Sequence, residues 1–283
     1  MKVAVTGASG HLGNVLCRQL LERGYEVNAL YNSDFTPLEG LNVNSYQGSI
    51  LDRNVLIEFM KNCDFLFHCA GKISINSSEN ELVLKTNIEG VRTVLEVAIE
   101  SEIKKIIHVS SIHAVSELPL NSEMNEDRPY KKEEDFAYDF SKAKGEQIML
   151  KAFRNEDIHG CVVRPSCIVG KYDFKPSEFG KALLDMKNGK IPLLPRGGYN
   201  FINVEDVSCA MINAIEQGVN GQAYFLTHQY YSIREIAKMV SDIGEDRVFK
   251  MGWWILLHIA PLVHHAYRFN PWIDMLFFSL LVW

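Results

Sequence analysis

A tyrosine and a lysine stand four residues apart in the segment Tyr138-Asp139-Phe140-Ser141-Lys142. On a helix, this spacing places both side chains on one face, about one turn apart. A cation near a phenol favours the phenolate and lowers the pKa of the phenol, so such a tyrosine can exchange a proton with a carbonyl or alcohol oxygen near neutral pH. The alternative is an ordinary pair on a helix surface, since a chain with 11 tyrosines often contains this spacing by chance.

A serine can complete such a site. Ser110 and Ser111 follow a predicted strand at 106–109, and they therefore lie at the carboxyl end of the strand, where α/β sheets bind ligands. A serine hydroxyl there can hydrogen-bond the same substrate oxygen as the tyrosine. We favour Ser111 over Ser110 for this position.

Asn87 precedes a predicted helix at 89–100. It can hold a water that connects Lys142 to solvent, and a plain helix-start asparagine is an equally good interpretation. The candidate catalytic residues are therefore Ser111, Tyr138, Lys142 and Asn87.

Glycines cluster directly after the first predicted strand, at 3–6, and before an amphipathic helix. Backbone amides at the head of a helix can approach a pyrophosphate closely only where side chains are absent. A purely structural turn is the plainer alternative, but the position between a strand and a helix at the start of the chain favours a dinucleotide site. We expect cofactor contacts from Gly7, Ser9, Gly10, His11, Leu12 and Gly13.

The choice between nicotinamide cofactors is usually made at the end of the second strand, predicted here at 26–31. Asn32 can donate to a 2′-phosphate there, no carboxylate at Tyr31 repels one, and Asp34 is expected to lie too far round the loop. The sequence therefore predicts NADP or NAD, with NADP preferred.

Further cofactor contacts are expected at two later turns. Asp52, beside Leu51, can accept from the adenine amino group, although an N-cap for a predicted helix at 53–61 accounts for it equally well. The turn after a predicted strand at 65–67 supplies the others, namely Cys69, Ala70 and Gly71.

Strands and helices alternate in the part of the chain that must position these residues. Strands are predicted at 3–6, 26–31, 43–46, 65–67, 106–109 and 161–163, and helices between them at about 11–23, 53–61, 89–100 and 138–153. Continuous apolar strands between helices are typical of a parallel sheet covered on both faces. The fold class is therefore α/β, with a doubly wound parallel sheet of the Rossmann type.

The alternation weakens after residue 165, where the loops hold Pro176, Pro192 and Pro195. We predict a dinucleotide-binding domain at 1–165, to which residues 201–228 return. Residues 166–200 and 229–283 form a smaller, interleaved substrate lobe in this prediction, with an apolar tail at 252–283.

Five segments of the chain, in this order, resemble an extended short-chain dehydrogenase/reductase: TGASGHLG, VSSIHAV, YDFSKAKGE, RPSCIVG and NFINVEDV. The resemblance covers residues 1–243, and the ordered set is specific although each motif alone is not. It implies a nicotinamide cofactor, Tyr138 as the acid–base residue, Lys142 holding the nicotinamide ribose, Ser111 positioning the substrate and Asn87 as the fourth member. It also places Pro165 and Ser166 near the nicotinamide.

The branch of this family is indicated by Tyr199, because nucleotide-sugar epimerases typically carry an arginine there that clamps the substrate pyrophosphate. The stretch 197–201 instead resembles dihydroflavonol reductase-like and 3β-hydroxysteroid dehydrogenase-like members, which act on apolar ketones, aldehydes or alcohols. A reductase or dehydrogenase is thus preferred over a nucleotide-sugar epimerase or dehydratase with a tightly held cofactor, and over a non-catalytic NAD(P)-binding sensor. We expect Asp206 to cap the helix that runs through Ile215.

Composition limits the partners. A net charge of −6 makes nucleic acid an unlikely partner, and six cysteines without a C-x-x-C pair indicate reduced thiols in a cytoplasmic protein. The three histidines between residues 252 and 267 match no zinc spacing, so no metal is expected. The tail 252–283 holds all four tryptophans and two charges, which favours either an apolar lid over the substrate or a peripheral membrane contact. We also expect the protein to bind a small-molecule substrate and to form a homodimer.

Overall fold

Seven strands form the larger sheet in the computed structural model, which describes residues 1–74, 76–119, 122–191, 194 and 197–240. The strands are β1 (Lys2–Thr6), β2 (Glu26–Tyr31), β3 (Asn44–Gln47), β4 (Phe65–His68), β5 (Lys105–Val109), β6 (His159–Pro165) and β9 (Ala223–Leu226). Their order is β3-β2-β1-β4-β5-β6-β9, and each neighbouring pair is parallel. The predicted parallel sheet is confirmed.

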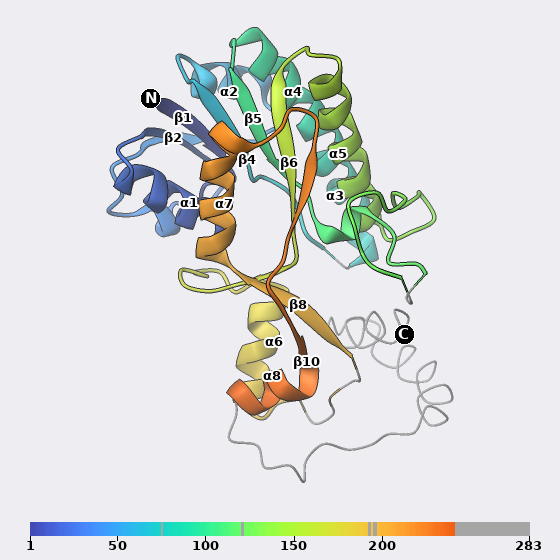
Figure 1. Cartoon of the computed structure of the whole chain (residues 1–283). Coiled ribbons are helices and arrows are strands. Elements are labelled where there is room, and N and C mark those ends of the chain that lie inside the picture. The colour runs from blue at the N-terminus through green and yellow to red at the C-terminus, as the bar shows by residue number, and fades with distance from the viewer. Residues whose placement is uncertain (75, 120–121, 192–193, 195–196, 241–283) are drawn as a thin grey trace.

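Helices cover both faces of this sheet (Figure 1). One face carries α1 (His11–Glu22) and α7 (Val204–Gln217), and the other carries α2 (Arg53–Met60), α4 (Gly90–Glu100) and α5 (Ala137–Arg154). Successive strand residues point to opposite faces. In β1, Val3 and Val5 therefore pack with α1 and α7, whereas Ala4 packs with the other three helices. Two apolar layers thus enclose the sheet, as a doubly wound fold requires.

The helix predicted at 89–100 begins earlier, and that boundary was wrong. A helical run starts with α3 (Asn80–Leu84), widens into a π-helical turn at Lys85–Glu89 and continues as α4. The wide turn shifts the apolar residues out of the regular 3.6-residue period, so the sequence pattern does not show it. Asn87 lies inside this turn and is buried.

A smaller sheet lies beyond the carboxyl end of the larger one (Figure 1). Its order is β10-β8-β7, formed by β7 (Cys167–Val169), β8 (Gly198–Asn203) and β10 (Gln229–Ser232), and α6 (Glu178–Lys187) and α8 (Ile233–Val240) belong to the same lobe. Residues 201–228 are thus divided: the end of β8 pairs in the smaller sheet, whereas α7 and β9 pack on the larger one.

The cap of α7 differs from the prediction. The side chain of Asn203 accepts a hydrogen bond from the main-chain N–H of Glu205 at 2.9 Å, so Asn203 is the N-cap, and Asp206 lies in the first turn. The helix begins at Val204, directly after β8, because the chain passes from strand to helix without an intervening loop.

A buried ion pair joins α5 to β6. Glu146 and Arg164 are 0% and 2% exposed, and the guanidinium donates to both carboxylate oxygens, with Nε 3.1 Å from each and Nη2 2.6 Å from Oε1. The Tyr130 hydroxyl donates to the same Oε1 at 2.8 Å. Arg164 also donates to the carbonyl of Glu126 at 2.9 Å, so the buried charges are hydrogen-bonded as well as paired.

Among the residues that the structure describes, no helix combines the length and the apolar character needed to cross a bilayer. The predicted apolar tail at 252–283 lies outside the described residues, as do Pro192 and Pro195.

Breaking the buried pair should destabilise the protein strongly. We expect Glu146→Gln to lower the free energy of unfolding by about 3–5 kcal/mol, because the Arg164 guanidinium is left buried without an anion. Urea unfolding followed by far-ultraviolet circular dichroism measures the change. The double change Glu146→Leu with Arg164→Met should recover much of the loss. Glu100→Gln, which removes the exposed partner of Arg53, should have a far smaller effect, and an equal loss in both single variants would contradict the interpretation.

Candidate active site

The glycine turn between β1 and α1 leaves no room for side chains. Gly7 has φ +66°, and a Cβ there would lie 2.7 Å from the main-chain N of Ala70. A Cβ on Gly13 would lie 2.1 Å from the carbonyl oxygen of Gly7. Gly10 caps α1 without a side-chain hydrogen bond, and no acid stands in the first turn. The first amides of α1 can therefore bond an anion, and the turn fits the pyrophosphate of a dinucleotide.

The loop after β4 lies between this turn and the candidate catalytic residues. The Ala70 N–H donates to Thr6 Oγ1 at 3.2 Å, which joins the loop to the end of β1. A Cβ on Gly71 would lie 3.4 Å from Asn87 Oδ1 and 3.6 Å from Lys142 Nζ. Cys69, Ala70 and Gly71 thus border both parts of the expected cofactor site.

At the end of β2, the side chain of Asp34 is engaged within its own loop. Its Oδ1 accepts from the main-chain N–H of Thr36 at 3.0 Å, while the Asn32 carbonyl accepts from Gln47 Nε2 at 3.3 Å. Further along, Asp52 is the N-cap of α2, because Oδ1 accepts from the N–H groups of Asn54 and Val55 at 3.0 and 3.3 Å. The capping role of Asp52 is thus present, and its contact with adenine stays a prediction, as does that of Leu51.

The Ser111 side chain lies close enough to Tyr138 to lower the pKa of its phenol, although Ser111 follows β5 and Tyr138 stands in the first turn of α5. Ser111 Oγ also accepts from the main-chain N–H of His113 at 3.1 Å, which caps a short helical turn at 112–114. The neighbouring Ser110 hydroxyl is buried without a partner in the described part of the chain. The structure therefore brings Ser111 to the phenol.

The pKa of the phenol differs from the prediction. Burial raises the pKa of Tyr138 to about 12, the nearby Ser111 side chain lowers it, and the carboxyl of Asp139 raises it. Lys142 Nζ donates to the carbonyl of Val109 at 2.9 Å, so its charge is turned toward that carbonyl and does not lower the pKa of the phenol. Burial lowers the pKa of Lys142 itself to about 8, although the Glu146 carboxylate opposes this change.

Asn87 holds two segments together. Its Oδ1 accepts from the Lys72 N–H at 2.8 Å, and its Nδ2 donates to the Lys72 carbonyl and to Ser141 Oγ, both at 2.9 Å. The helix-start interpretation is wrong, because Asn87 lies inside the helical run. The asparagine instead fixes the loop after β4 against α5, beside Lys142.

Two residues expected near the nicotinamide lie at the same edge of the sheet. Pro165 ends β6, and the N–H of Ser166 donates to the carbonyl of Leu226 at 2.9 Å. The Ser166 hydroxyl is buried and has no partner within the described ranges. In the smaller lobe, the ring of Tyr199 lies 5.8 Å from that of Phe179 and 6.3 Å from that of Phe201, so Tyr199 packs among aromatic side chains.

Sequence reasoning missed a segment that crosses the first turn of α1. The carbonyl of Lys171 lies 2.9 Å from His11 Nε2, and the carbonyl of Tyr172 accepts from Asn14 Nδ2 at 3.1 Å. The guanidinium of Arg18 lies 4.2 Å from the centre of the Tyr172 ring. No local pattern predicts these contacts, because about 160 positions separate the partners and a signal from spacing cannot reach that far.

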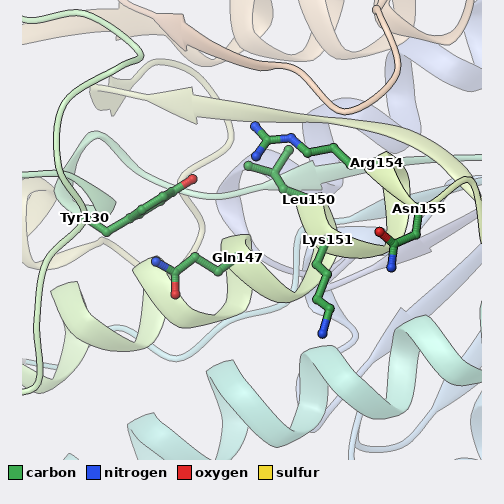
Figure 2. A pocket seen from close by; sticks show the side chains of 6 residues that line it. All are labelled: Tyr130, Gln147, Leu150, Lys151, Arg154 and Asn155. Atoms are coloured by element: carbon green, nitrogen blue, oxygen red, sulfur yellow. The ribbon is translucent and has the colours of Figure 1, made fainter.

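A surface pocket lies elsewhere on α5 (Figure 2). Its lining contains none of Ser111, Tyr138, Lys142 and Asn87, and Lys151 lies more than two helical turns beyond Lys142. In the described residues, no group of three or more His, Cys, Asp or Glu side chains could hold a metal ion. The pocket is lined by Tyr130, Gln147, Leu150, Lys151, Arg154 and Asn155.

The chain is similar to proteins of one family. The profile of the NAD dependent epimerase/dehydratase family matches residues 3–226. Sterol demethylase protein B of Methylococcus capsulatus is 30% identical over 246 residues, which cover 86% of this chain and 74% of that protein. A putative dihydroflavonol 4-reductase of Synechocystis is 31% identical over 247 residues, covering 84% and 71%.

A third relative is sterol-4-alpha-carboxylate 3-dehydrogenase, decarboxylating, of Mus musculus, which is 29% identical over 277 residues and covers 93% of this chain and 74% of that one. Among solved structures, gox2253 matches with a TM-score of 0.83 and 27% identity, covering 95% of this chain and 84% of that chain. The resemblance to dihydroflavonol reductase-like and hydroxysteroid dehydrogenase-like proteins is confirmed.

We expect Lys142 to destabilise the folded protein when no cofactor is bound. Its pKa of about 8 lies below the ordinary 10.5, so below pH 8 the folded chain holds an ammonium that the unfolded chain solvates better. Lys142→Met should therefore raise the free energy of unfolding at pH 7, by on the order of 1–3 kcal/mol. Between pH 8 and 10.5 the parent should gain stability relative to the variant, because its unfolded state then binds more protons.

Urea unfolding at pH 7 and pH 10 measures this difference. Lys144→Met, at an exposed position on the same helix, is the matched control and should change little. A Lys142→Met protein that is less stable than its parent at pH 7 would show that burial of the ammonium does not destabilise the folded state.

Proposed function

The chain belongs to the NAD dependent epimerase/dehydratase family, and from that membership we propose that it is an NAD(P)-dependent oxidoreductase. It moves a hydride between nicotinamide and the carbonyl or alcohol carbon of a small, fairly apolar substrate. The observation that supports this proposal is the closeness of the Ser111 hydroxyl to the Tyr138 phenol at the carboxyl end of β5, with Lys142 one helical turn further on.

The chain's own residues have distinct tasks in this proposal. The bound cofactor supplies or accepts the hydride. Ser111 holds the substrate oxygen, and the Tyr138 hydroxyl donates its proton to that oxygen as negative charge develops there. A phenol with a pKa of about 12 is protonated at neutral pH, so Tyr138 carries the proton that it would donate to the substrate oxygen. Lys142, beside Gly71, would hold the nicotinamide ribose in this proposal.

The environment of Tyr199 supports an apolar substrate. Its ring lies 5.8 Å from Phe179 and 6.3 Å from Phe201, and burial raises the pKa of its hydroxyl. An epimerase acting on a sugar nucleotide would need a cation to bind the substrate pyrophosphate, and the aromatic group at this position offers none. A sensor without catalysis has no need of a proton donor such as Tyr138. A reductase or dehydrogenase is therefore preferred to both alternatives.

The name of one relative suggests a narrower class of substrate. The mouse protein is named for a carboxylate on carbon 4 and a dehydrogenation at carbon 3. We extend this arrangement to the present chain: an apolar alcohol or ketone that bears a carboxylate on the carbon next to the reacting one.

We propose NADP as the preferred cofactor. Asn32 can donate to a 2′-phosphate, and the nearby carboxylate of Asp34 is engaged with the main chain of Thr36.

Replacing the phenol should abolish the reaction without preventing cofactor binding. Tyr138→Phe should lower kcat by about 10²-fold or more, the scale of general acid catalysis, while the Kd for NADPH changes less than about twofold. NADPH absorbance during reduction of a panel of 3-oxo acids and apolar ketones provides the measurement. Tyr25→Phe, after α1, is the control. Turnover at the parental rate would remove Tyr138 from the mechanism, and conversion of UDP-sugars without net NADPH use would favour the epimerase.

A single negative charge at position 32 should reverse the cofactor preference. The parent should bind NADPH at least as tightly as NADH, and Asn32→Asp should reverse that order, because a carboxylate repels the 2′-phosphate. Asn32→Ser, which adds no charge, is the matched control. Isothermal titration with both cofactors tests this directly, and tighter NADH binding by the parent would refute the NADP preference.

A further inference from the structure

A buried carboxyl group follows the reactive tyrosine. Asp139 is 3% exposed, and its Oδ1 has no hydrogen-bond partner among the described residues. The imidazole of His113 faces it, with Nδ1 at 3.8 Å from Oδ1. That distance is too long for a hydrogen bond. A buried oxygen without a partner is costly, so this gap needs an explanation.

His113 also lies beside Ser111 and Tyr138. Its main-chain N–H donates to Ser111 Oγ at 3.1 Å, and its ring lies edge-on to the Tyr138 ring with the centres 6.4 Å apart. The side chain is 43% exposed. The main chain of His113 thus contacts the serine, while its imidazole lies beside the tyrosine ring and faces the buried carboxyl.

Charged groups of the loop between β5 and α5 surround the pair. Lys131 contacts Glu117 and lies 3.7 Å from Asp135. Burial raises the pKa of Asp139 to about 7; the ammonium of Lys131 lowers it, and Glu117 and Asp135 raise it. Burial also lowers the pKa of His113, as does Lys131, whereas Glu117 raises it. Because Nδ1 of His113 lies 3.8 Å from Oδ1 of Asp139, the protonation of the carboxyl, whose pKa is about 7, bears on the hydrogen bonding of the imidazole.

Two cations of this loop, Lys131 and Arg128, are already engaged. Lys131 is paired with two carboxylates, and Arg128 donates to the carbonyls of Leu118, Pro119 and Ser122. Neither is available to a substrate anion near Ser111 and Tyr138. In the described part of the chain the His113 imidazole makes no hydrogen bond, so one of its nitrogens can offer an N–H to such an anion.

We propose that His113 and Asp139 act as one hydrogen-bonded pair that recognises the substrate carboxylate next to the reacting carbon. This rests on the proposed function and names the residues that would select such a substrate. With two protons on the pair, the Asp139 hydroxyl donates to Nδ1 of His113, and Nε2–H points outward as a donor. With one proton, Nδ1–H donates to the Asp139 carboxylate, and Nε2 presents a lone pair that repels an anion.

Binding of a carboxylate therefore selects the two-proton form and takes up one proton. Octanoate is a suitable probe, with 1-octanol as its uncharged match, and both are titrated into the full chain saturated with NADP⁺. Affinity is followed by thermal shift, and the protonation of His113 by ¹⁵N NMR of the imidazoles. Octanoate should bind about tenfold more tightly at pH 6 than at pH 8, since one proton is taken up across the pair's titration. The affinity for 1-octanol should not change with pH.

Three variants separate this role from a structural one. His113→Phe should weaken octanoate binding about tenfold or more at pH 6, with less than a twofold change for 1-octanol and NADP⁺. Asp139→Asn should remove the pH dependence and retain the fold. His159→Phe, at the start of β6 on the opposite edge of the sheet, is the matched control.

The proposal is overturned if octanoate does not bind, if its affinity is independent of pH, or if His113→Phe leaves it unchanged. Such a result would leave the proposed function intact as long as Tyr138→Phe still abolishes hydride transfer. A parent that transfers no hydride at all would refute the proposed function instead, and the binding experiment stands apart from that outcome because it needs no turnover.

Discussion

The buried pair of Glu146 and Arg164 determines how α5 lies on the sheet, and the rest of the site depends on that placement. Tyr138, Lys142 and Glu146 recur every fourth residue, so they form one stripe along the helix. Because the last of them is held against β6 by a guanidinium, the rotation of the helix about its axis is determined, and with it the direction of the phenol and the ammonium.

The same placement of α5 buries ionisable groups, and the residues of the site therefore contribute unfavourably to the free energy of folding. Burial lowers the pKa of Lys142 and raises that of Asp139, so each is held where its charged form is poorly solvated. Parallel strands end together at one edge, and polar side chains that follow β4 and β5 are enclosed there by the helices. Stability supplied by the apolar layers on both faces of the sheet offsets this cost.

Local patterns were enough to predict the sheet, the glycine turn and the positions of Ser111 and Tyr138, because strand–turn–helix alternation is encoded within short windows. Other features depend on tertiary geometry. The sign of the pKa change at Tyr138 depends on where Lys142 points, and the meeting of His113 with Asp139 depends on the path of a long loop. Asn87 was selected from its position, yet the wide helical turn that holds it has no regular period to detect.

The path of the chain between the two sheets has a consequence for recombination and engineering. It leaves the larger sheet between Pro165 and Cys167, returns at Asn203–Val204, and leaves again after Leu226 toward Gln229. The smaller lobe is therefore not a contiguous module, and no single cut excises it. Exchanging the smaller lobe between relatives requires grafting separate segments at matched junctions, so point changes within this lobe are simpler to make than a transfer of the whole lobe.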